Sequence, residues 1–239
     1  MPKPEVRPKG HPGPVKPAIR SPIRAVGARF VASVAGVGEV PAGPPEIAMC
    51  GRSNVGKSSL INALCNHKAL ARISRTPGRT QRVNLFDLDL ATGETLRLVD
   101  LPGFGHARAP GAVRDSFSPM IQAYLLDQDR MAAVVLLLDA RRDTDEDAIG
   151  FAQWLVEHKR PVAVVMTKAD QVPKNRRFAV QVRLQREYGL SRPPPAVSVT
   201  EDLGIDELLH MLRALAFPNA RSPRKPGPRK PAAADSGPV

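Results

Sequence analysis

Short apolar runs alternate with longer amphipathic stretches along most of the chain, and this pattern predicts alternating strands and helices. Two continuous apolar runs, at 131–138 and 162–166, have strand length and are typical of parallel strands covered on both faces. Between them, residues 147–159 carry apolar side chains at helical spacing. The segments 83–88 and 96–100 alternate between apolar and polar residues, which predicts a β-hairpin.

The remaining segments continue this alternation. We expect further strands at 30–34, 47–50 and 196–199, and further helices at 59–64, 175–188 and 205–215. Residues 68–81 lack a regular apolar period and predict a long mobile loop. Alternating strands and helices imply an α/β fold in three layers, with a mainly parallel sheet flanked by helices.

The composition of the chain indicates the size of its core and the compartment in which we expect it. The 239 residues are 42% hydrophobic, which is enough for one substantial core. The longest apolar run, 131–138, is far shorter than the roughly 20 residues that span a bilayer, so we expect a soluble protein without a membrane span. The two cysteines, Cys50 and Cys65, fall within predicted elements and suit small buried side chains, which favours a reducing, cytoplasmic compartment.

The net charge of +12 is concentrated at the two ends of the chain. Residues 1–24 carry a net charge of +5, and residues 221–239 carry +4. Both ends are rich in proline and poor in large apolar side chains, so burial cannot offset the entropy lost on ordering. We therefore predict a disordered basic extension at 1–28, one domain at 29–217 and a disordered basic tail at 218–239.

A phosphate-binding motif occupies the centre of the predicted fold. The chain fits G-x-x-x-x-G-K-[ST] between a predicted strand and a predicted helix, with the residues Gly51, Arg52, Ser53, Asn54, Val55, Gly56, Lys57, Ser58 and Ser59. In such a loop successive backbone N–H groups point at one centre, the lysine reaches the β- and γ-phosphates, and the Ser58 hydroxyl ligates Mg²⁺. The alternative, a glycine-rich turn with a solvated lysine, requires the pattern to arise by accident.

Two further motifs follow predicted strands. The first is Asp100, Leu101, Pro102 and Gly103, where a carboxylate can hold Mg²⁺ and the Gly103 N–H can meet a γ-phosphate. The second is Thr167, Lys168, Ala169 and Asp170. Asp170 can accept two hydrogen bonds from guanine, and adenine would leave it unpaired. Backbone groups of Ser198, Val199 and Thr200 are candidates for the guanine oxygen. Taken singly, each of these segments could be an ordinary turn.

Together and in this order, the motifs resemble those of the EngB family of bacterial GTP-binding proteins, within the TrmE-Era-EngA-EngB-septin class of P-loop GTPases. The resemblance is carried by 51–59, 76–81, 100–105 and 167–170, and it extends over about residues 29–217. Two departures from the common pattern are small. Thr167 stands where most GTPases have asparagine, as is common in EngB-like proteins, and Val199 replaces the family's usual second serine.

The resemblance implies roles that the residues alone do not give. It implies that Thr80 is the switch threonine, which closes on Mg²⁺ and the γ-phosphate within a nucleotide-contacting segment of Gly78, Arg79, Thr80, Gln81 and Arg82. The implied metal ligands are Ser58, Thr80 and Asp100. Asn54 is implied to help coordinate K⁺ beside the phosphates, so that Lys57, Thr80 and Asn54 form the expected catalytic group.

Phe104 stands where Ras-like GTPases carry a glutamine that orients water. A phenyl ring cannot polarise water, so we expect slow intrinsic hydrolysis. A ring that simply packs the loop is compatible with the same expectation.

The family implies a role in assembly of the large ribosomal subunit and in normal cell division and septation. We expect a monomer that binds GTP and GDP and contacts the large-subunit precursor and its rRNA. Basic residues near the predicted nucleotide site could meet RNA phosphates or form a solvated face, namely Arg72, Arg75, Arg79, Arg82, Arg108 and Arg114. Two other classes stay open, a P-loop ATPase or kinase and a basic nucleic-acid-binding module without switching.

Overall fold

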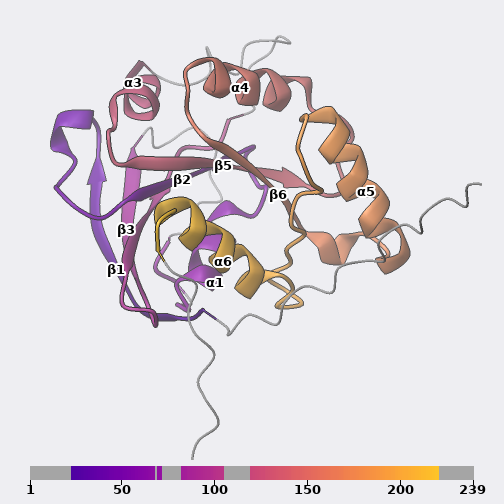
Figure 1. Cartoon of the computed structure of the whole chain (residues 1–239), viewed down its shortest axis with the longest axis horizontal. Coiled ribbons are helices and arrows are strands. Elements are labelled where there is room, and N and C mark those ends of the chain that lie inside the picture. Colours follow the sequence, from indigo (N-terminus) through magenta and orange to yellow (C-terminus); the bar gives the residue numbers. More distant parts are fainter. Residues whose placement is uncertain (1–22, 68, 72–81, 105–118, 221–239) are drawn as a thin grey trace, which may run out of the picture. The chain divides into compact units, whose positions relative to one another are not determined.

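The computed structural model describes residues 23–67, 69–71, 82–104 and 119–220. These residues form a six-stranded sheet in the order β1-β3-β4-β2-β5-β6 (Figure 1). The strands are β1 (Ala25–Val34), β2 (Glu46–Gly51), β3 (Val83–Leu90), β4 (Thr95–Asp100), β5 (Met131–Asp139) and β6 (Val162–Thr167). The four strands from β4 to β6 in this order run parallel, and the β1–β3 and β3–β4 pairs are antiparallel. The predicted α/β fold and the predicted hairpin are confirmed.

Helices cover both faces of the sheet. They are α1 (Lys57–Leu64), α3 (Pro119–Asp127), α4 (Glu146–Glu157), α5 (Lys174–Glu187) and α6 (Ile205–Ala216). In Figure 1, α3 and α4 lie on one side of the sheet, α1 and α6 lie on the other, and α5 stands beside β6. One buried cluster joins α3, α4 and α5 to the sheet, and a second joins α1 and α6 to its opposite face.

The central strands explain why their sequences are apolar throughout. In β5, Val134 and Leu136 belong to the cluster under α4, whereas Val135 and Leu137 belong to the cluster under α1 and α6. A strand with a helical layer on each face buries both sets of alternating side chains, so no polar position is left. The carboxyl ends of β2, β4, β5 and β6 therefore meet along one edge, where a ligand of an open α/β sheet binds.

The first strand starts earlier than predicted. β1 begins at Ala25, because Ala25 pairs with Leu90 of β3 and the antiparallel ladder continues to Val34. Ile23, before the strand, is only 1% exposed. The expected boundary between a disordered extension and the domain at residue 29 is therefore wrong for 23–28. Of the tail predicted at 218–239, residues 218–220 are described, and the Ala220 N–H donates to the Phe217 carbonyl at 3.0 Å. Residues 1–22 and 221–239 lie outside the described residues.

The segment 196–199, predicted as a strand, does not form a regular ladder with the sheet. Ala196 makes one isolated pairing with Met166 of β6, and Ser198 pairs with Leu203 instead. The prolines at 193–195 have no N–H to donate, and the chain then folds back on itself, so a ladder cannot extend.

Helix α3 was not predicted from the sequence, although Ile121, Tyr124 and Leu125 of this helix are buried. Most of the expected loop at 68–81 lies outside the described residues. Within the described part of the chain, no helix is both long enough and apolar enough to span a bilayer.

Candidate nucleotide-binding site

The phosphate loop connects β2 to α1 at the carboxyl edge of the sheet. Gly56 precedes the helix with a φ of 101°, a left-handed conformation that glycine adopts without steric cost. No side chain caps the first turn of α1, so N–H groups of that turn remain available to an anion. At Gly51 a Cβ atom would stand 2.8 Å from the Leu137 carbonyl oxygen, so a side chain would push the loop off β5.

The D-x-P-G segment lies against the phosphate loop. The Phe104 N–H donates to the Gly51 carbonyl at 3.2 Å, and the Ser53 N–H donates to the Phe104 carbonyl at 3.0 Å. A Cβ atom at Gly103 would stand 3.1 Å from the Ser53 nitrogen, which is tighter than ordinary packing allows. Two segments that are about 50 residues apart in the sequence therefore form one backbone unit.

Lys57 and Asp100 form an ion pair between these two segments. Their side chains are only 12% and 11% exposed, so the pair is largely withdrawn from solvent. An ammonium group that is held here by one carboxylate has two further N–H donors for phosphate oxygens. The two residues lie where the sequence predicts them.

The donor set suits Mg²⁺ in the presence of phosphates. Ser58 and Asp100 supply a hydroxyl and a carboxylate, which are hard oxygen ligands. In the described ranges there is no group of three or more His, Cys, Asp or Glu side chains that could hold a metal alone. Mg²⁺ commonly takes one or two protein ligands and completes its shell with phosphate oxygens and water. Thr80, the third expected ligand, lies outside the described residues.

The T-K-x-D segment is tied to the phosphate loop by its first two residues. The buried Thr167 hydroxyl lies 2.8 Å from the Val55 carbonyl oxygen and 3.1 Å from that of Leu138. Lys168 donates to the Asn54 carbonyl, and its Nζ lies 3.0 Å from a carboxylate oxygen of Asp139. The Lys168 stem therefore runs over the phosphate loop, near Gly56.

Asp170 is oriented by hydrogen bonds on both carboxylate oxygens. The Ser198 hydroxyl donates to one oxygen at 2.6 Å, and the Gln171 amide donates to the other at 2.5 Å. These bonds, that of Ser198 first, lower the pKa of Asp170. Asp170 is therefore ionised at neutral pH and offers two acceptor oxygens in a fixed orientation. This is the state that pairing with two donors of a purine requires.

The 196–200 segment contributes a side chain where only backbone contacts were expected. Ser198 is 1% exposed, and its hydroxyl both holds Asp170 and accepts from the Glu201 N–H at 3.1 Å. Val199 is 42% exposed, and Thr200 is also exposed. The hydroxyl of Ser198 is thus a positioning group for Asp170, which the sequence alone did not indicate.

The structure brings together most of the predicted residues. The phosphate loop, the D-x-P-G segment, the T-K-x-D segment and Ser198 meet at one edge of the sheet. Four expected residues of the switch segment, Gly78, Arg79, Thr80 and Gln81, lie outside the described residues. Arg82 is exposed and donates to the Ser33 carbonyl at 3.1 Å, so its side chain contacts β1.

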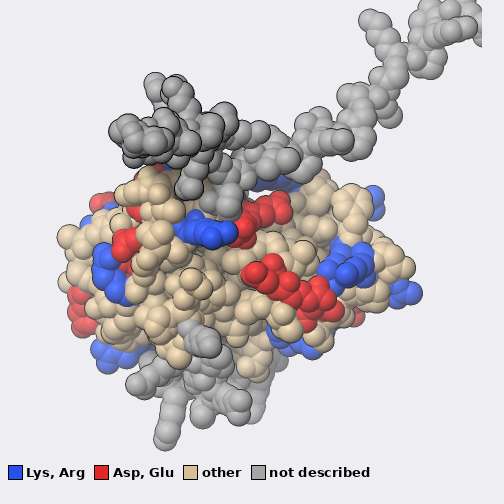
Figure 2. Space-filling model, turned by 90° about the horizontal axis from the view of Figure 1, so that it is seen from below, with Lys and Arg blue, Asp and Glu red and all other residues tan. Residues whose placement is uncertain are grey.

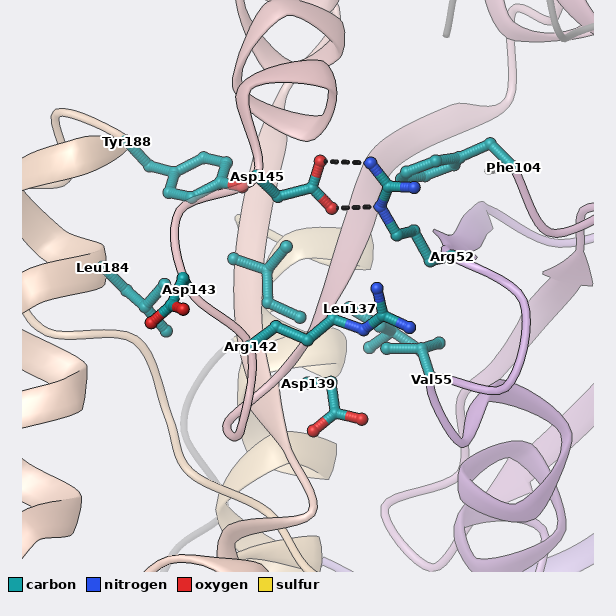
Figure 3. A pocket seen from close by; sticks show the side chains of 11 residues that line it. Arg52, Val55, Phe104, Leu137, Asp139, Arg142, Asp143, Asp145, Leu184 and Tyr188 are labelled. Atoms are coloured by element: carbon teal, nitrogen blue, oxygen red, sulfur yellow. Dashed lines mark hydrogen bonds and ion pairs between the residues drawn. The ribbon is translucent and has the colours of Figure 1, made fainter. Parts of the chain in front are cut away.

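Arg52 has a role that the motif did not reveal. Its guanidinium group forms two hydrogen bonds with Asp145 (Figure 3). It also donates to Asp147 at 3.0 Å. Asp145 caps α4 by accepting from the Ala148 N–H at 3.2 Å. The phosphate loop is thereby fixed to the beginning of α4, next to a small hollow that Phe104 and other residues line.

Phe104 is buried, and its ring packs 5.8 Å from that of Phe151 on α4. Its side chain therefore belongs to the core beneath α4, while its backbone bonds to the phosphate loop. Figure 3 shows the Phe104 ring beside the Arg52 guanidinium group.

We expect replacement of Thr167 by valine to lower the free energy of unfolding by about 1–2 kcal/mol, because it removes the single hydroxyl hydrogen that the buried carbonyls of Val55 and Leu138 share. Urea denaturation measures this loss. The matched control is Thr144→Val, since the Thr144 hydroxyl is exposed and its bond to Glu187 contributes little. Equal effects of the two substitutions would contradict the structural role of Thr167.

The Arg52–Asp145 pair predicts a specific dependence of stability on pH. Burial opposes ionisation of Asp145, but the bonds from Arg52 and from the Ala148 N–H outweigh it and lower the pKa of Asp145. The stabilisation by Arg52 is therefore complete above the ordinary carboxyl pKa, near pH 4, and is lost as the pH falls through the lower pKa of the folded state. We expect Arg52→Gln to cost about 2 kcal/mol at pH 7 and progressively less below pH 4.

Urea unfolding of the wild type and of Arg52→Gln between pH 7 and pH 3 measures the difference. A difference that stays constant over the whole range would mean that ionisation of Asp145 plays no part.

The comparisons with known proteins agree with this geometry. Residues 46–168 match the family described as 50S ribosome-binding GTPase. In solved structures, the fold is similar to that of Aquifex aeolicus Era bound to GDP and aluminium fluoride, with a TM-score of 0.59 and 21% identity. This likeness covers 73% of this chain and 57% of the Era chain. The sheet and its loops therefore define a P-loop GTPase domain.

Closer relatives give the family. The chain is 44% identical over 211 residues to a probable GTP-binding protein EngB of Anaeromyxobacter dehalogenans, which covers 84% of this chain and 96% of the relative. It is 41% identical over 176 residues to an EngB protein of Syntrophus aciditrophicus, covering 74% and 88% of the two chains. A crystal structure of a probable EngB protein matches with a TM-score of 0.55 and 22% identity, over 72% of this chain and 99% of that one. The chain belongs to the EngB family of GTP-binding proteins.

Proposed function

We propose that the protein is a Mg²⁺-dependent, GTP-hydrolysing switch that acts in the cytoplasm, as a monomer, in assembly of the large ribosomal subunit. We further propose that it is needed for normal cell division and septation. The observation that supports a switch is that three loops at the nucleotide site are bonded to one another. Backbone bonds join Ser53 to Phe104, and side chains of Thr167 and Lys168 bond to the same phosphate loop. A change at the phosphates would therefore reach all three segments.

In the proposed mechanism, the phosphate loop holds the triphosphate with its backbone N–H groups, and Lys57 exchanges part of its interaction with Asp100 for phosphate oxygens. Ser58, Asp100 and Thr80 would hold Mg²⁺, which would supply positive charge to offset the charge that develops on the phosphates. Asp170 accepts two hydrogen bonds from guanine, while the stem of Lys168 covers the base.

We propose that intrinsic hydrolysis is slow, because the phenyl ring of Phe104 cannot orient the attacking water. Burial of the Phe104 ring against Phe151 supports this proposal, since the ring is committed to the core. A regulator or a second cation is then needed to compensate charge in the transition state.

The proposed second cation is K⁺, held with the help of Asn54. Asn54 is exposed and has a φ of 65°, while its carbonyl accepts from Lys168. We expect at least tenfold faster GTP turnover in K⁺ than in Na⁺, and loss of that difference in Asn54→Ala. Phosphate release measured in the two salts at equal ionic strength tests this. Equal rates for the wild type would remove K⁺ from the mechanism.

The proposed partner is the precursor of the large ribosomal subunit and its rRNA. The description of the matching family, 50S ribosome-binding GTPase, supports this choice. The arginines expected to meet RNA near the switch lie mostly outside the described residues, and Arg82 is the described member of that group. Phosphate contacts by such arginines would attract RNA without reading its sequence.

A pull-down on ribosomal subunits and their precursors tests the proposed function. We expect stronger retention with a non-hydrolysable GTP analogue than with GDP, and retention on the large-subunit precursor over the small subunit. Equal retention with both nucleotides would favour a basic nucleic-acid-binding module without switching. Truncation of residues 1–22 and 221–239 in the same assay, at several salt concentrations, separates tails that tether RNA from inert ones.

A further inference from the structure

We propose that the exposed face of α5 binds single-stranded or looped RNA, with Phe178 as the side chain on which a base stacks. This inference rests on the proposed function, because it assigns the RNA partner to one surface of the chain. We call this surface the α5 face. It consists of the exposed residues Lys174, Asn175, Phe178 and Arg186.

Phe178 is exposed without a structural reason in the fold. Its side chain is 66% exposed, while Val180, Leu184 and Tyr188 of the same segment pack against the core. Phe30, the other exposed phenylalanine of the described residues, has a partner, since its ring lies 5.7 Å from that of Phe86. In the described part of the chain, the Phe178 ring has no aromatic partner.

The cations of the α5 face form no ion pairs within the fold. Two other arginines of α5 do, since Arg177 pairs with Glu201 at 3.0 Å and Arg183 lies 3.5 Å from Asp143. By contrast, Lys174, Arg176 and Arg186 make no ion pair with any residue that the structure describes. Such unpaired cations are available to an anionic partner.

Two cations at the beginning of α5 interact unfavourably with the dipole of the helix. Lys174 and Arg176 lie in the first turn of α5, which contains no acidic residue. Cations at a helix N-terminus oppose the helix dipole. The only acidic residue of α5, Glu187, is its last residue. The fold therefore gains nothing from the charges of Lys174 and Arg176, whereas Arg186 lies in the last turn, where the dipole favours a cation.

The spacing along α5 fits an extended nucleic acid. Lys174 precedes Phe178 by four residues and Arg186 follows it by eight, so all three lie on the solvent side of the helix. At a rise of 1.5 Å per residue, Lys174 and Arg186 are about 18 Å apart along the axis. Figure 1 places α5 at the margin of the domain beside β6, and Figure 2 shows Lys and Arg side chains at that margin, with a group of Asp and Glu side chains next to them.

The combination favours RNA over a protein partner. A single ring between cations matches a base between its phosphates, and stacking on an aromatic side chain accepts any base. The core of a protein interface is more apolar and carries fewer charged residues than the rest of the surface. Within 174–187, Phe178 is the only strongly exposed large apolar side chain.

The test is fluorescence anisotropy of the full-length protein with a labelled 12-nucleotide oligouridine and with a 12-base-pair RNA duplex, at several salt concentrations. We expect Phe178→Ala to weaken binding of the single strand about tenfold. Its effect on the duplex is expected to be less than twofold, because paired bases cannot stack on the ring. Phe178→Trp is expected to restore single-strand affinity. The matched control is Val156→Ala, which truncates another apolar side chain that is 63% exposed.

The charges are tested with matched double variants. Lys174→Gln with Arg186→Gln is compared with Arg24→Gln and Lys159→Gln, a pair of exposed cations outside α5. Each lost phosphate contact lowers the salt slope of single-strand binding by about 0.7, so we expect a decrease of about 1.4 for the α5 pair and none for the control pair. Equal slopes for the two double variants would overturn the proposal, as would equal effects of Phe178→Ala and Val156→Ala.

The same experiment distinguishes failure of the α5 face from failure of the proposed function. If the wild type and the α5 variants all retain GTP and bind RNA equally well, the α5 face is wrong and the proposed function stands. If the wild type retains GTP but binds neither RNA, the RNA partner itself is wrong. GTP affinity, measured for every variant, is expected to be unchanged, which excludes misfolding as the cause of any loss.

Discussion

Replacement of Asp170 by asparagine is expected to weaken binding of GTP at least 100-fold and to give the protein affinity for xanthosine triphosphate. In the wild type, both oxygens of Asp170 accept hydrogen bonds, and those from Ser198 and Gln171 fix the orientation of the carboxylate. Guanine offers two donors, at N1 and at the 2-amino group. The asparagine amide has only one acceptor oxygen, so its NH₂ group would face one of the two guanine donors. That loss, with the loss of charge, is worth about 3 kcal/mol.

Xanthine has a carbonyl oxygen in place of the 2-amino group, and this oxygen can accept from the asparagine amide. Calorimetric titration of wild type and Asp170→Asn with both nucleotides measures the exchange. Ser198→Ala is the graded control, since it removes one of the bonds that orient Asp170 and is expected to weaken GTP binding by less than Asp170→Asn. Unchanged GTP affinity in Asp170→Asn would mean that another group selects the base.

Replacement of Lys57 by methionine is expected to abolish measurable nucleotide binding, with a loss of at least 100-fold in affinity for both GTP and GDP. Methionine keeps most of the side chain's volume and apolar stem but removes the positive charge that faces the phosphates. Because Lys57 pairs with the largely buried Asp100, the substitution also leaves that carboxylate without its partner. Both consequences lower affinity, since an unpaired anion beside the phosphate loop repels the ligand.

The double variant Lys57→Met with Asp100→Asn separates these two consequences. We expect it to recover protein stability, because the unpaired buried charge is removed, without recovering nucleotide affinity. Thermal unfolding and calorimetric titration of the two variants provide the measurements. Recovery of affinity in the double variant would show that Lys57 serves only to neutralise Asp100.

The elements that could be predicted from the sequence are those whose signal is local. β5 and β6 are continuous apolar runs, and both lie where the runs predict them. The phosphate loop was found from its glycines and Lys57, because that conformation and that chemistry need these residue types. The carboxyl ends of parallel strands then placed Asp100 and the T-K-x-D segment at the same edge.

The features that were missed depend on contacts between distant parts of the chain. β1 extends to Ala25 because β3 pairs with it, and residues 25–29 lack an alternating pattern of their own. Arg52 and Asp145 are 93 residues apart, and neither belongs to a motif that pairs them. The hydrogen bond from Ser198 to Asp170 likewise depends on a contact between distant segments, because the 196–198 segment lies beside β6 through the pairing of Ala196 with Met166.

The Arg52–Asp145 pair also suggests why α4 is well placed to respond to the nucleotide. It fixes the start of α4 to the phosphate loop, and the packing of Phe104 on Phe151 fixes the next turn to the D-x-P-G segment. Phe151 in turn stacks on Trp154, with ring centroids 5.9 Å apart. Because Trp154 is the only tryptophan of the chain, its fluorescence provides a direct reporter of this contact.

The most direct measurement is calorimetric titration of the purified full-length protein with GTP and, separately, with ATP, in the presence of Mg²⁺. A site in which Asp170 selects the purine predicts binding of GTP at least 100-fold tighter than binding of ATP. Equal affinity for the two nucleotides, or no binding of either, would contradict it.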